Sequence, residues 1–290
     1  MKIAGFTIIK NAVTNDFPIV EAIRSILPVV DEMIVLIGDS SDATVALMEA
    51  IGDPKIKIHH SVWNKNLRKG GAVLADETNK AFHLIGDEYT WAFYIQGDEV
   101  VHEKYHPSIR TACEKYASDT EVQGLLFKYK HFYGTYDYVG DSRKWYAHEI
   151  RIIRNNKAIS AYRDAQGFRK APDQKLKVAP ANARVFHYGW VKDPQAMQRK
   201  QESFHKLWHD DAWLEKNIKV ATAFDYEDHI HELARFEGTH PQWIAERIVE
   251  RNWTFQTDIS RNKKSLKNKI KDLLKAIGID THYANYTLIR

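Results

Sequence analysis

The 290-residue sequence contains a single cysteine, Cys113, which excludes an internal disulfide and indicates a reducing compartment. Cys113 shares an apolar helical spacing with Ile109 and Tyr116, so we interpret it as a buried helix residue. No window approaches the roughly 18 apolar residues that a membrane span requires. The apolar run at residues 3–9 is too short and too polar at its end for a signal peptide. We therefore expect a cytoplasmic protein.

Two regions of the sequence lack the motif of a well-known catalytic class. The turn after the first predicted strand reads Lys10-Asn11-Ala12-Val13, without the Gly-X-Gly-X-X-Gly pattern of dinucleotide-binding oxidoreductases. The cluster of acids and histidines at residues 225–232 does not match a dedicated zinc pattern such as His-Glu-X-X-His, and we interpret it as a solvated helix face. A dinucleotide oxidoreductase is thus largely excluded.

The net positive charge is concentrated in the C-terminal region. The net charge is +4, and residues 261–277 hold seven Lys or Arg against Asp272 alone, which leaves the body near −2 (4 − 6). We therefore expect no nucleic-acid partner. Residues 261–277 also carry an apolar stripe, which predicts an amphipathic helix. Two alternatives stay open for it: peripheral contact with an anionic membrane near a lipid-linked acceptor, or docking against its own domain.

Strand-like and helix-like stretches alternate over the first hundred residues. Predicted strands cover 3–9, 33–37, 55–59, 91–95, 122–130, 150–154, 158–162 and 184–187. Helices are predicted from Asp16 as a cap, from Thr44, over 72–85 and 107–116, and from Pro194. Residues 150–162 read as a hairpin around Asn155-Asn156, and only helices are expected after residue 209. The pattern predicts an α/β fold with a mixed, mainly parallel sheet flanked by helices and a C-terminal helical extension.

The most informative stretch is Trp91 to Glu99. A buried strand ends there in Gln96-Gly97-Asp98-Glu99, and the carboxyl ends of such strands are where open α/β sheets bind ligands. Asp98 and Glu99 suit a hard divalent cation, and Gly97 lets the backbone approach a ligand closely. The alternative is an ordinary polar turn.

Two other loops carry polar groups at the same predicted edge. Asp39 is placed to accept hydrogen bonds from a base or ribose hydroxyl, or else to form the turn, while Asp42 caps the next helix. Arg68, with Lys69 and Gly70-Gly71 at a helix start, has donors suited to a diphosphate.

Five motifs in order resemble the nucleotide-binding half of family 2 glycosyltransferases, which have the GT-A (Rossmann-like) fold. They are Asn11, Asp39 to Thr44, Asn66-Leu67-Arg68, Asn79-Lys80-Ala81 and Gln96-Gly97-Asp98-Glu99. The resemblance covers about residues 1–210. It implies a domain 1–208, with a nucleotide-sugar half 1–101 and an acceptor half 102–208, followed by an extension 209–290.

The resemblance implies specific roles in the first half. Asp39 would contact the base or ribose, Arg68 the diphosphate, and Asp98 an Mn²⁺ or Mg²⁺ bridging both phosphates. Asn11 and Gly97 would belong to the same nucleotide-sugar site. Gln96 stands where the family often has its first Asp, which weakens the expected ribose or metal contact there.

In the second half, the resemblance places an acid near the acceptor and a late histidine near the metal. Asp164 is our first choice for the base that takes the acceptor proton, and Glu149 is the second. A salt bridge to Arg151, Arg154 or Arg163 would explain either acid equally well. His187 would complete the metal shell or meet the phosphates. Lys128, His131, Tyr133 and Trp145 could shape the acceptor pocket.

The resemblance thus implies a metal-dependent, inverting glycosyltransferase that uses a nucleotide-sugar, with UDP as the expected nucleotide. The acceptor would be a saccharide or a lipid-linked saccharide of cell-surface polysaccharide synthesis. A nucleotidyltransferase would share the sheet and the metal. A non-catalytic nucleotide-binding module also stays open because of Gln96.

Overall fold

A computed structural model describes residues 1–67, 69–142, 145–170, 173–209, 213, 215–216, 221–227, 232–259 and 284–289. Arg68 and the predicted amphipathic helix 261–277 lie outside the described residues. Within these ranges, every helix is too short or too polar to cross a membrane.

The N-terminal half is a parallel sheet with helical crossovers. Its strands are β1 (Ile3–Ile9), β2 (Glu32–Ile37), β3 (Ile56–His60) and β4 (Trp91–Tyr94), in the spatial order β4-β1-β2-β3. The connections hold α1 (Ile19–Ile26), α2 (Thr44–Glu49), η1 (Lys69–Gly71) and α3 (Ala72–His83). The predicted strand and helix alternation is confirmed. The strand order reverses between β1 and β4, which is where open parallel sheets form a ligand crevice.

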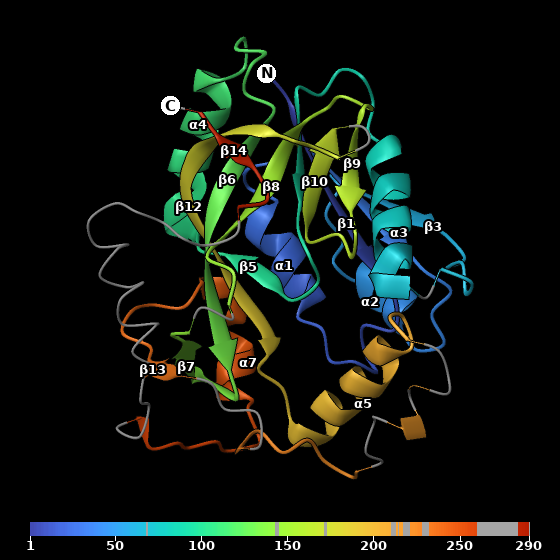
Figure 1. Cartoon of the computed structure of the whole chain (residues 1–290), viewed down its shortest axis with the longest axis vertical. Helices are drawn as coiled ribbons and strands as arrows, with labels where there is room; N and C mark the ends of the chain where they lie inside the picture. Colours follow the sequence, from blue (N-terminus) through green and yellow to red (C-terminus); the bar gives the residue numbers. More distant parts are fainter. Residues whose placement is uncertain are drawn as a thin grey trace.

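The second half extends this sheet with antiparallel and parallel pairs. Its strands are β5 (Glu99–Val101), β6 (Gly124–Tyr133), β7 (Thr135–Gly140), β8 (His148–Arg154), β12 (Lys177–Trp190), β13 (Leu233–Arg235) and β14 (Thr287–Leu288). Its helices are η2 (Glu103–Tyr105), α4 (His106–Lys115), α5 (Pro194–His205), η4 (Gln242–Ile244) and α7 (Ala245–Val249). A small second sheet has β9 (Ile159–Tyr162), β10 (Gly167–Lys170) and β11 (Gln174–Lys175). Figure 1 shows α3 at the β1–β3 side, β7, β13 and α7 at the opposite lower side, and α5 near the lower edge.

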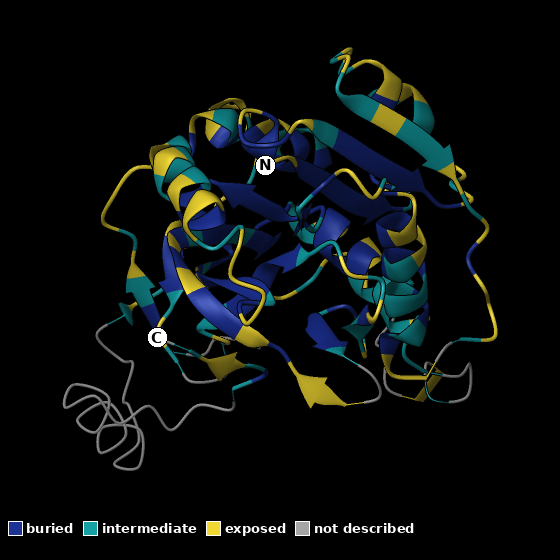
Figure 2. Ribbon diagram, turned by 90° about the horizontal axis from the view of Figure 1, so that it is seen from above, coloured by how far each residue is buried: buried dark blue, intermediate teal, exposed yellow. Residues whose placement is uncertain are grey.

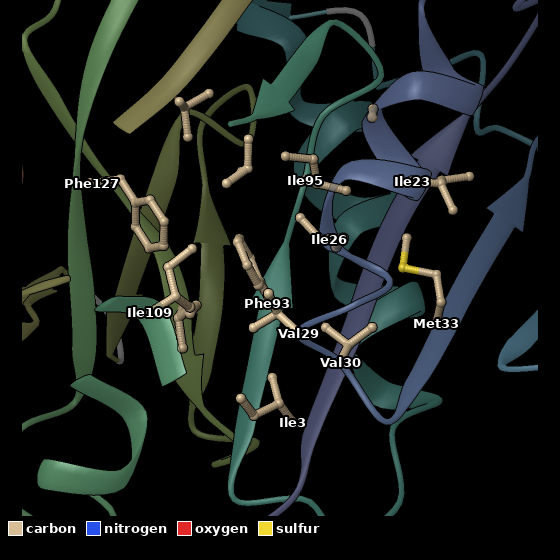
Figure 3. Close-up of a cluster of buried hydrophobic side chains, with 14 of the residues drawn as sticks. Ile3, Ile23, Ile26, Val29, Val30, Met33, Phe93, Ile95, Ile109 and Phe127 are labelled. Atoms are coloured by element: carbon tan, nitrogen blue, oxygen red, sulfur yellow. The ribbon is translucent and has the colours of Figure 1, made fainter. Parts of the chain in front are cut away.

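Two apolar cores cover the two faces of the sheet because successive strand residues point to opposite sides. In β4, Trp91 and Phe93 join the core with α1 and α4, while Tyr94 joins the core with α3. Figure 3 shows Ile23 and Ile26 of α1 pointing at Met33 and Phe93. The central strands β1, β2 and β4 are almost wholly buried, several outer strands are partly or fully exposed, and the helices expose one face (Figure 2). The predicted α/β architecture, with a mixed sheet flanked by helices, is confirmed.

Two local predictions are wrong. β9 does not pair with β8 as a hairpin; it pairs with β10, and β8 lies between β4 and β6. Asp16 does not cap α1, whose cap position is Pro18 without a side-chain hydrogen bond. The Asp16 carboxylate instead binds Arg247, with 2.6 Å between Oδ1 and Nη1.

The expectation that no strand follows residue 209 is also wrong. β13 pairs with β7, and β14 pairs with β12, so short segments near the C-terminus extend the main sheet. Strands of two or three residues are too short to leave a periodic pattern, and their hydrogen bonds to an existing edge stabilise them.

A buried ion pair joins the halves of the sheet. Arg151 of β8 donates from Nη2 to Glu99 Oε1 at 2.7 Å and from Nε to Glu99 Oε2 at 2.9 Å, and both side chains are fully buried. Tyr129 of β6 donates to the same carboxylate at 2.6 Å. The Arg151 guanidinium also lies over the Tyr94 and Tyr129 rings. Burial of a charged pair is tolerated when both members are fully hydrogen-bonded, as here.

Removing one member of this pair should destabilise the protein strongly. Arg151→Met leaves the Glu99 carboxylate buried without its cation, and we expect a loss of about 3–5 kcal/mol in the free energy of unfolding, measured by urea denaturation. Lys177→Met, which breaks the exposed pair of Lys177 with Glu121, is the control and should leave the transition unchanged. Equal effects of the two variants would contradict the importance of the buried pair.

Candidate active site

A pocket of about 530 Å³ opens at the carboxyl ends of β1 and β4. This is the point of reversed strand order, where ligand binding is expected. α5 contributes one wall of the pocket and the end of β12 another. Six residues singled out from the sequence line it: Asn11, Gln96, Gly97, Asp98, Asp164 and His187.

The pairing of β5 with β12 brings His187 beside Asp98. His187 pairs in register with Glu99, and the Tyr188 amide donates to the Asp98 carbonyl at 2.8 Å. The His187 Nε2 atom lies 3.7 Å from Asp98 Oδ1. Gly189 comes two residues after His187 in β12. A Cβ atom at this position would lie 2.7 Å from Asp98 Oδ2 and 2.8 Å from His187 Nε2. Only glycine leaves room for the two side chains to converge.

The hydrogen bonds of His131 determine which nitrogen of His187 carries a proton. His131 Nε2 lies 2.8 Å from the Tyr146 carbonyl oxygen, which can only accept, so this nitrogen donates. Burial lowers the pKa of His131 to about 3, so the ring is neutral and its Nδ1 is an acceptor. The His187 Nδ1 atom, 3.1 Å away, must therefore donate to it. Burial also lowers the pKa of His187, although Asp98 opposes this, so this ring is neutral as well. Its proton is on Nδ1, and the lone pair of Nε2 therefore faces Asp98.

This arrangement fits a divalent cation. A lone pair on His187 Nε2 and a carboxylate oxygen of Asp98 face each other without a proton between them, and a neutral imidazole held by a second hydrogen bond is the usual form of a metal ligand. The described residues would supply only these two ligands. In the part of the chain that the structure describes, no three His, Cys, Asp or Glu side chains cluster as metal ligands. Further ligands would have to come from a substrate or from water.

Asp98 is ionised and charge-balanced. Its burial opposes ionisation, but the positive charges of Lys200 and its other neighbours outweigh this and hold its pKa well below the usual range. Lys200 Nζ donates to Asp98 Oδ2 at 3.1 Å and to the Gly189 carbonyl at 2.8 Å.

The expectation that Glu99 also suits a metal is wrong. Both of its oxygens accept hydrogen bonds from Arg151, and its side chain is fully buried. The backbone N–H of Gln96 also donates to Glu99 Oε2 at 3.1 Å. Glu99 therefore holds the turn, while Asp98 faces the pocket.

The loops after β1 and β2 are tied together by Asn11. Its side-chain Oδ1 accepts a hydrogen bond from the backbone N–H of Ser41 at 2.8 Å, and its own backbone N–H donates to Ser40 Oγ at 3.0 Å. Asp39 does not itself line the pocket, but it binds two residues that do. Its Oδ1 accepts from Lys10 Nζ at 2.6 Å and from the Trp63 amide at 3.1 Å. Although its partial burial favours the neutral form, these contacts lower the pKa of Asp39.

Gln96 and Gly97 shape the turn itself. Gln96 Nε2 donates to the Ala165 carbonyl at 3.3 Å, so this residue links the turn to the loop that carries Asp164. A Cβ on Gly97 would lie 3.1 Å from Ile9, which explains the small residue by packing.

Asp164 lies in a constrained loop at the pocket wall. Its neighbours Arg163 and Ala165 have positive φ angles of 54° and 61°, a strained conformation for non-glycine residues that is often found at functional sites. Arg151 Nη1 donates to the Gln166 carbonyl at 3.2 Å, which braces the loop. A Cβ on Gly71 would lie 2.8 Å from Asp164 Cβ, so the start of α3 packs directly against this acid. Burial raises the pKa of Asp164, although backbone hydrogen bonds partly oppose this.

Glu149 lies behind the pocket and does not line it. It is 5% exposed, and its Oε2 atom makes no hydrogen bond of ordinary geometry within the described residues. Burial raises the pKa of Glu149 to about 8, although Arg151 opposes this. Glu149 is thus largely protonated at neutral pH. The salt bridges considered for both acids are not formed by Arg151 or Arg154: Arg151 binds Glu99, and Arg154 binds four backbone carbonyls.

Sequence reasoning missed several pocket residues. Lys200 is one of them, and the only signal for it was a lysine on the buried face of α5 with Ala196 and Met197. Asn15, Trp63 and Trp208 also line the pocket, and each has a buried polar atom without a partner: Asn15 Oδ1, Trp63 Nε1 and Trp208 Nε1. Buried polar atoms are normally paired, so these three atoms are unsatisfied within the described residues.

Comparisons with known proteins give a distant likeness. No family model matches the chain, and no curated protein matches it. Among solved structures, it is similar to glucosyl-3-phosphoglycerate synthase from Mycobacterium tuberculosis in complex with Mn²⁺, UDP and phosphoglyceric acid. The identity is 20%, the TM-score is 0.30, and the match covers 46% of this chain and 43% of the synthase. It is also similar to S. aureus TarS 1-349 in complex with UDP, with 14% identity, a TM-score of 0.40 and coverage of 77% and 68%. The chain thus matches less than half the length of the synthase.

The protonated state of Glu149 predicts a pH dependence of stability. The folded pKa of about 8 lies above the unfolded value near 4.5, so the stabilisation is complete below about pH 4.5 and is lost as the pH rises toward 8. Glu149→Gln mimics the protonated acid and removes this loss. The free energy of unfolding of the variant, relative to that of wild type, should therefore rise between pH 5 and pH 9, as measured by urea unfolding. One pKa unit corresponds to about 1.4 kcal/mol.

The exposed Glu114 provides the control for this experiment. Glu114→Gln should follow the wild-type pH profile. Parallel profiles for Glu149→Gln and wild type would show that Glu149 is ionised in the folded protein.

Proposed function

We propose that this protein is a GT-A-type glycosyltransferase, similar to family 2, that transfers a sugar from a nucleotide-sugar to a hydroxyl group with inversion. The observation that carries the proposal is the convergence of Asp98, His187 and Asp164 in one pocket at the point of reversed strand order. These residues come from three separate segments. UDP is the nucleotide we expect.

The nucleotide end of the donor is assigned to the loops after β1 and β2. Asp39 uses Oδ1 for both of its protein contacts, and its Oδ2 makes no hydrogen bond within the described residues. That oxygen suits a ribose hydroxyl or a base N–H. Trp63 and Asn15 also line the pocket, and each has a buried polar atom without a partner within the described residues. Arg68 stays a prediction for the diphosphate.

Asp98 and His187 would hold an Mn²⁺ or Mg²⁺ ion through Oδ1 and Nε2. When bound, the ion would neutralise the charge that builds on the leaving diphosphate. Gln96 supports this site by fixing the turn against the Asp164 loop. His131 supports it by keeping the His187 lone pair directed toward Asp98.

Asp164 is our proposed base, which takes the proton from the acceptor hydroxyl as that oxygen attacks the anomeric carbon. It lines the pocket, and its raised pKa makes it a stronger base than an exposed aspartate. Glu149, the second choice, does not line the pocket and holds its proton at neutral pH. The geometry therefore favours Asp164.

The acceptor side faces α5 and the chain beyond it. Phe204 and Trp208 lie in the pocket wall, and such aromatic faces suit the apolar face of a sugar ring. A saccharide or lipid-linked saccharide of cell-surface polysaccharide synthesis is the acceptor class we propose. The division into halves 1–101 and 102–208 with an extension 209–290 is part of the same proposal. Membrane contact through 261–277 and a cytoplasmic location stay predictions.

The first test concerns nucleotide and metal binding. UDP, GDP and dTDP are titrated calorimetrically into the wild type with and without Mn²⁺, and we expect one of them to bind more tightly with the ion. Asp98→Ala removes a proposed ligand and should abolish this metal-dependent gain, at least about tenfold in Kd. If none of the three nucleotides binds in the presence of Mn²⁺, the proposed donor class is wrong.

The second test separates binding from chemistry. Asp164→Asn keeps the shape of the side chain but removes its basicity, so nucleotide affinity should stay within about twofold. Turnover of the nucleotide-sugar should fall by about 10²–10⁴, the usual contribution of a general base. Full turnover by Asp164→Asn, measured as nucleoside diphosphate release, would refute the assignment. Glu149→Gln tests the second choice in the same assay.

A further inference from the structure

Lys200 is a buried lysine that reaches the pocket from α5. It is 9% exposed and lines the pocket beside Asp98. Its ammonium group lies over the Phe17 and Phe204 rings, with 5.1 and 5.7 Å to their centroids. Burying an ammonium group costs free energy unless hydrogen bonds and opposite charge compensate for it.

The described residues accept hydrogen bonds from only two of the three N–H donors of this ammonium group. A lysine has three N–H donors, and Lys200 gives one to Asp98 Oδ2 and one to the Gly189 carbonyl. Within the described residues it makes no third hydrogen bond. A positive charge with one unused donor at a pocket wall suits an oxygen of an anionic ligand, and lysine is a common phosphate binder.

Lys200 and the proposed metal would use different oxygens of Asp98. Lys200 binds Oδ2, whereas His187 Nε2 faces Oδ1. The lysine therefore does not occupy the space between Asp98 and His187. It is a positive charge that stays beside Asp98 whether or not an ion is bound.

We propose that Lys200 is a second, permanent cation of the diphosphate site and binds a phosphate oxygen of the donor directly. The inference rests on the proposed function, because it assumes that a diphosphate lies beside Asp98. It implies that part of the affinity for a nucleoside diphosphate does not depend on the metal. The alternative is that Lys200 only anchors α5 to the Asp98 turn.

The experiment measures binding in the absence of metal. UDP and inorganic diphosphate are titrated into the full-length protein in buffer with EDTA, and UDP is titrated again with Mn²⁺. We expect both ligands to bind without metal. Lys200→Met should weaken this metal-free binding about tenfold or more, because it removes a charged donor. Lys200→Arg should retain most of it.

A second variant predicts changes of opposite sign. Asp98→Asn removes the negative charge that Lys200 neutralises and that repels phosphate. Metal-free binding of UDP and of inorganic diphosphate should therefore tighten several-fold, while the gain from Mn²⁺ is lost. In the double variant Asp98→Asn/Lys200→Met this tightening should be largely lost, whereas a lysine that only anchors α5 would leave it in place. Lys115→Met, at the exposed end of α4, is the control and should bind like wild type.

The outcomes separate this inference from the proposed function. If wild type binds UDP only with Mn²⁺, the role of Lys200 is refuted and the glycosyltransferase proposal stands. If inorganic diphosphate binds through Lys200 but no nucleotide does, the role of Lys200 stands and the donor class is wrong. Should Lys200→Met fail to fold, as judged by its thermal transition, Lys200→Arg and Asp98→Asn still decide: unchanged metal-free binding in Asp98→Asn would refute the proposal.

Discussion

The structure depends most on the buried pair of Glu99 and Arg151. Arg151 satisfies both carboxylate oxygens of Glu99 and also holds the Gln166 carbonyl, so one guanidinium fixes the Asp98 turn and the Asp164 loop together. This pair explains why two neighbouring acids have different roles. Glu99 is fully used inside the protein, and Asp98 is directed to the pocket. Breaking the pair would cost stability and would also release the two loops that carry the proposed chemistry.

A cation compensates the charge of Asp98 from one side only. Lys200 binds one oxygen, and the lone pair of His187, oriented through His131, faces the other. A single buried carboxylate can in this way stay ionised in a site of low polarity. The arrangement requires Gly189, because any side chain at that position would collide with both Asp98 and His187. The pocket is therefore a charge-balanced site built by the pairing of β5 with β12 and by the approach of α5.

Much of the fold was predictable because its central strands are long and apolar. Ile3–Ile9 and Trp91–Tyr94 are fully buried runs without a charged residue, and polar turns follow them. Predictions failed where local preference and tertiary contacts differ. Asn155-Asn156 has turn chemistry, yet β8 finds better partners in β4 and β6 than in β9. Asp16 is a good helix cap by residue type, but Arg247, far along the chain, binds it instead. β13 and β14 are stabilised only by the strands beside them.

The sequence by itself determined the α/β alternation, the turn that ends in Asp98, and the positions of Asp164 and His187 as candidate site residues, because these depend on local patterns and motifs. Only the tertiary structure decided which of these groups meet in one pocket. It assigned Glu99 to Arg151, separated Glu149 from the pocket, oriented His187 through His131 and brought Lys200 to Asp98. Each of these outcomes depends on contacts between residues 52 to 102 positions apart, or on burial, and neither leaves a local signal in the chain.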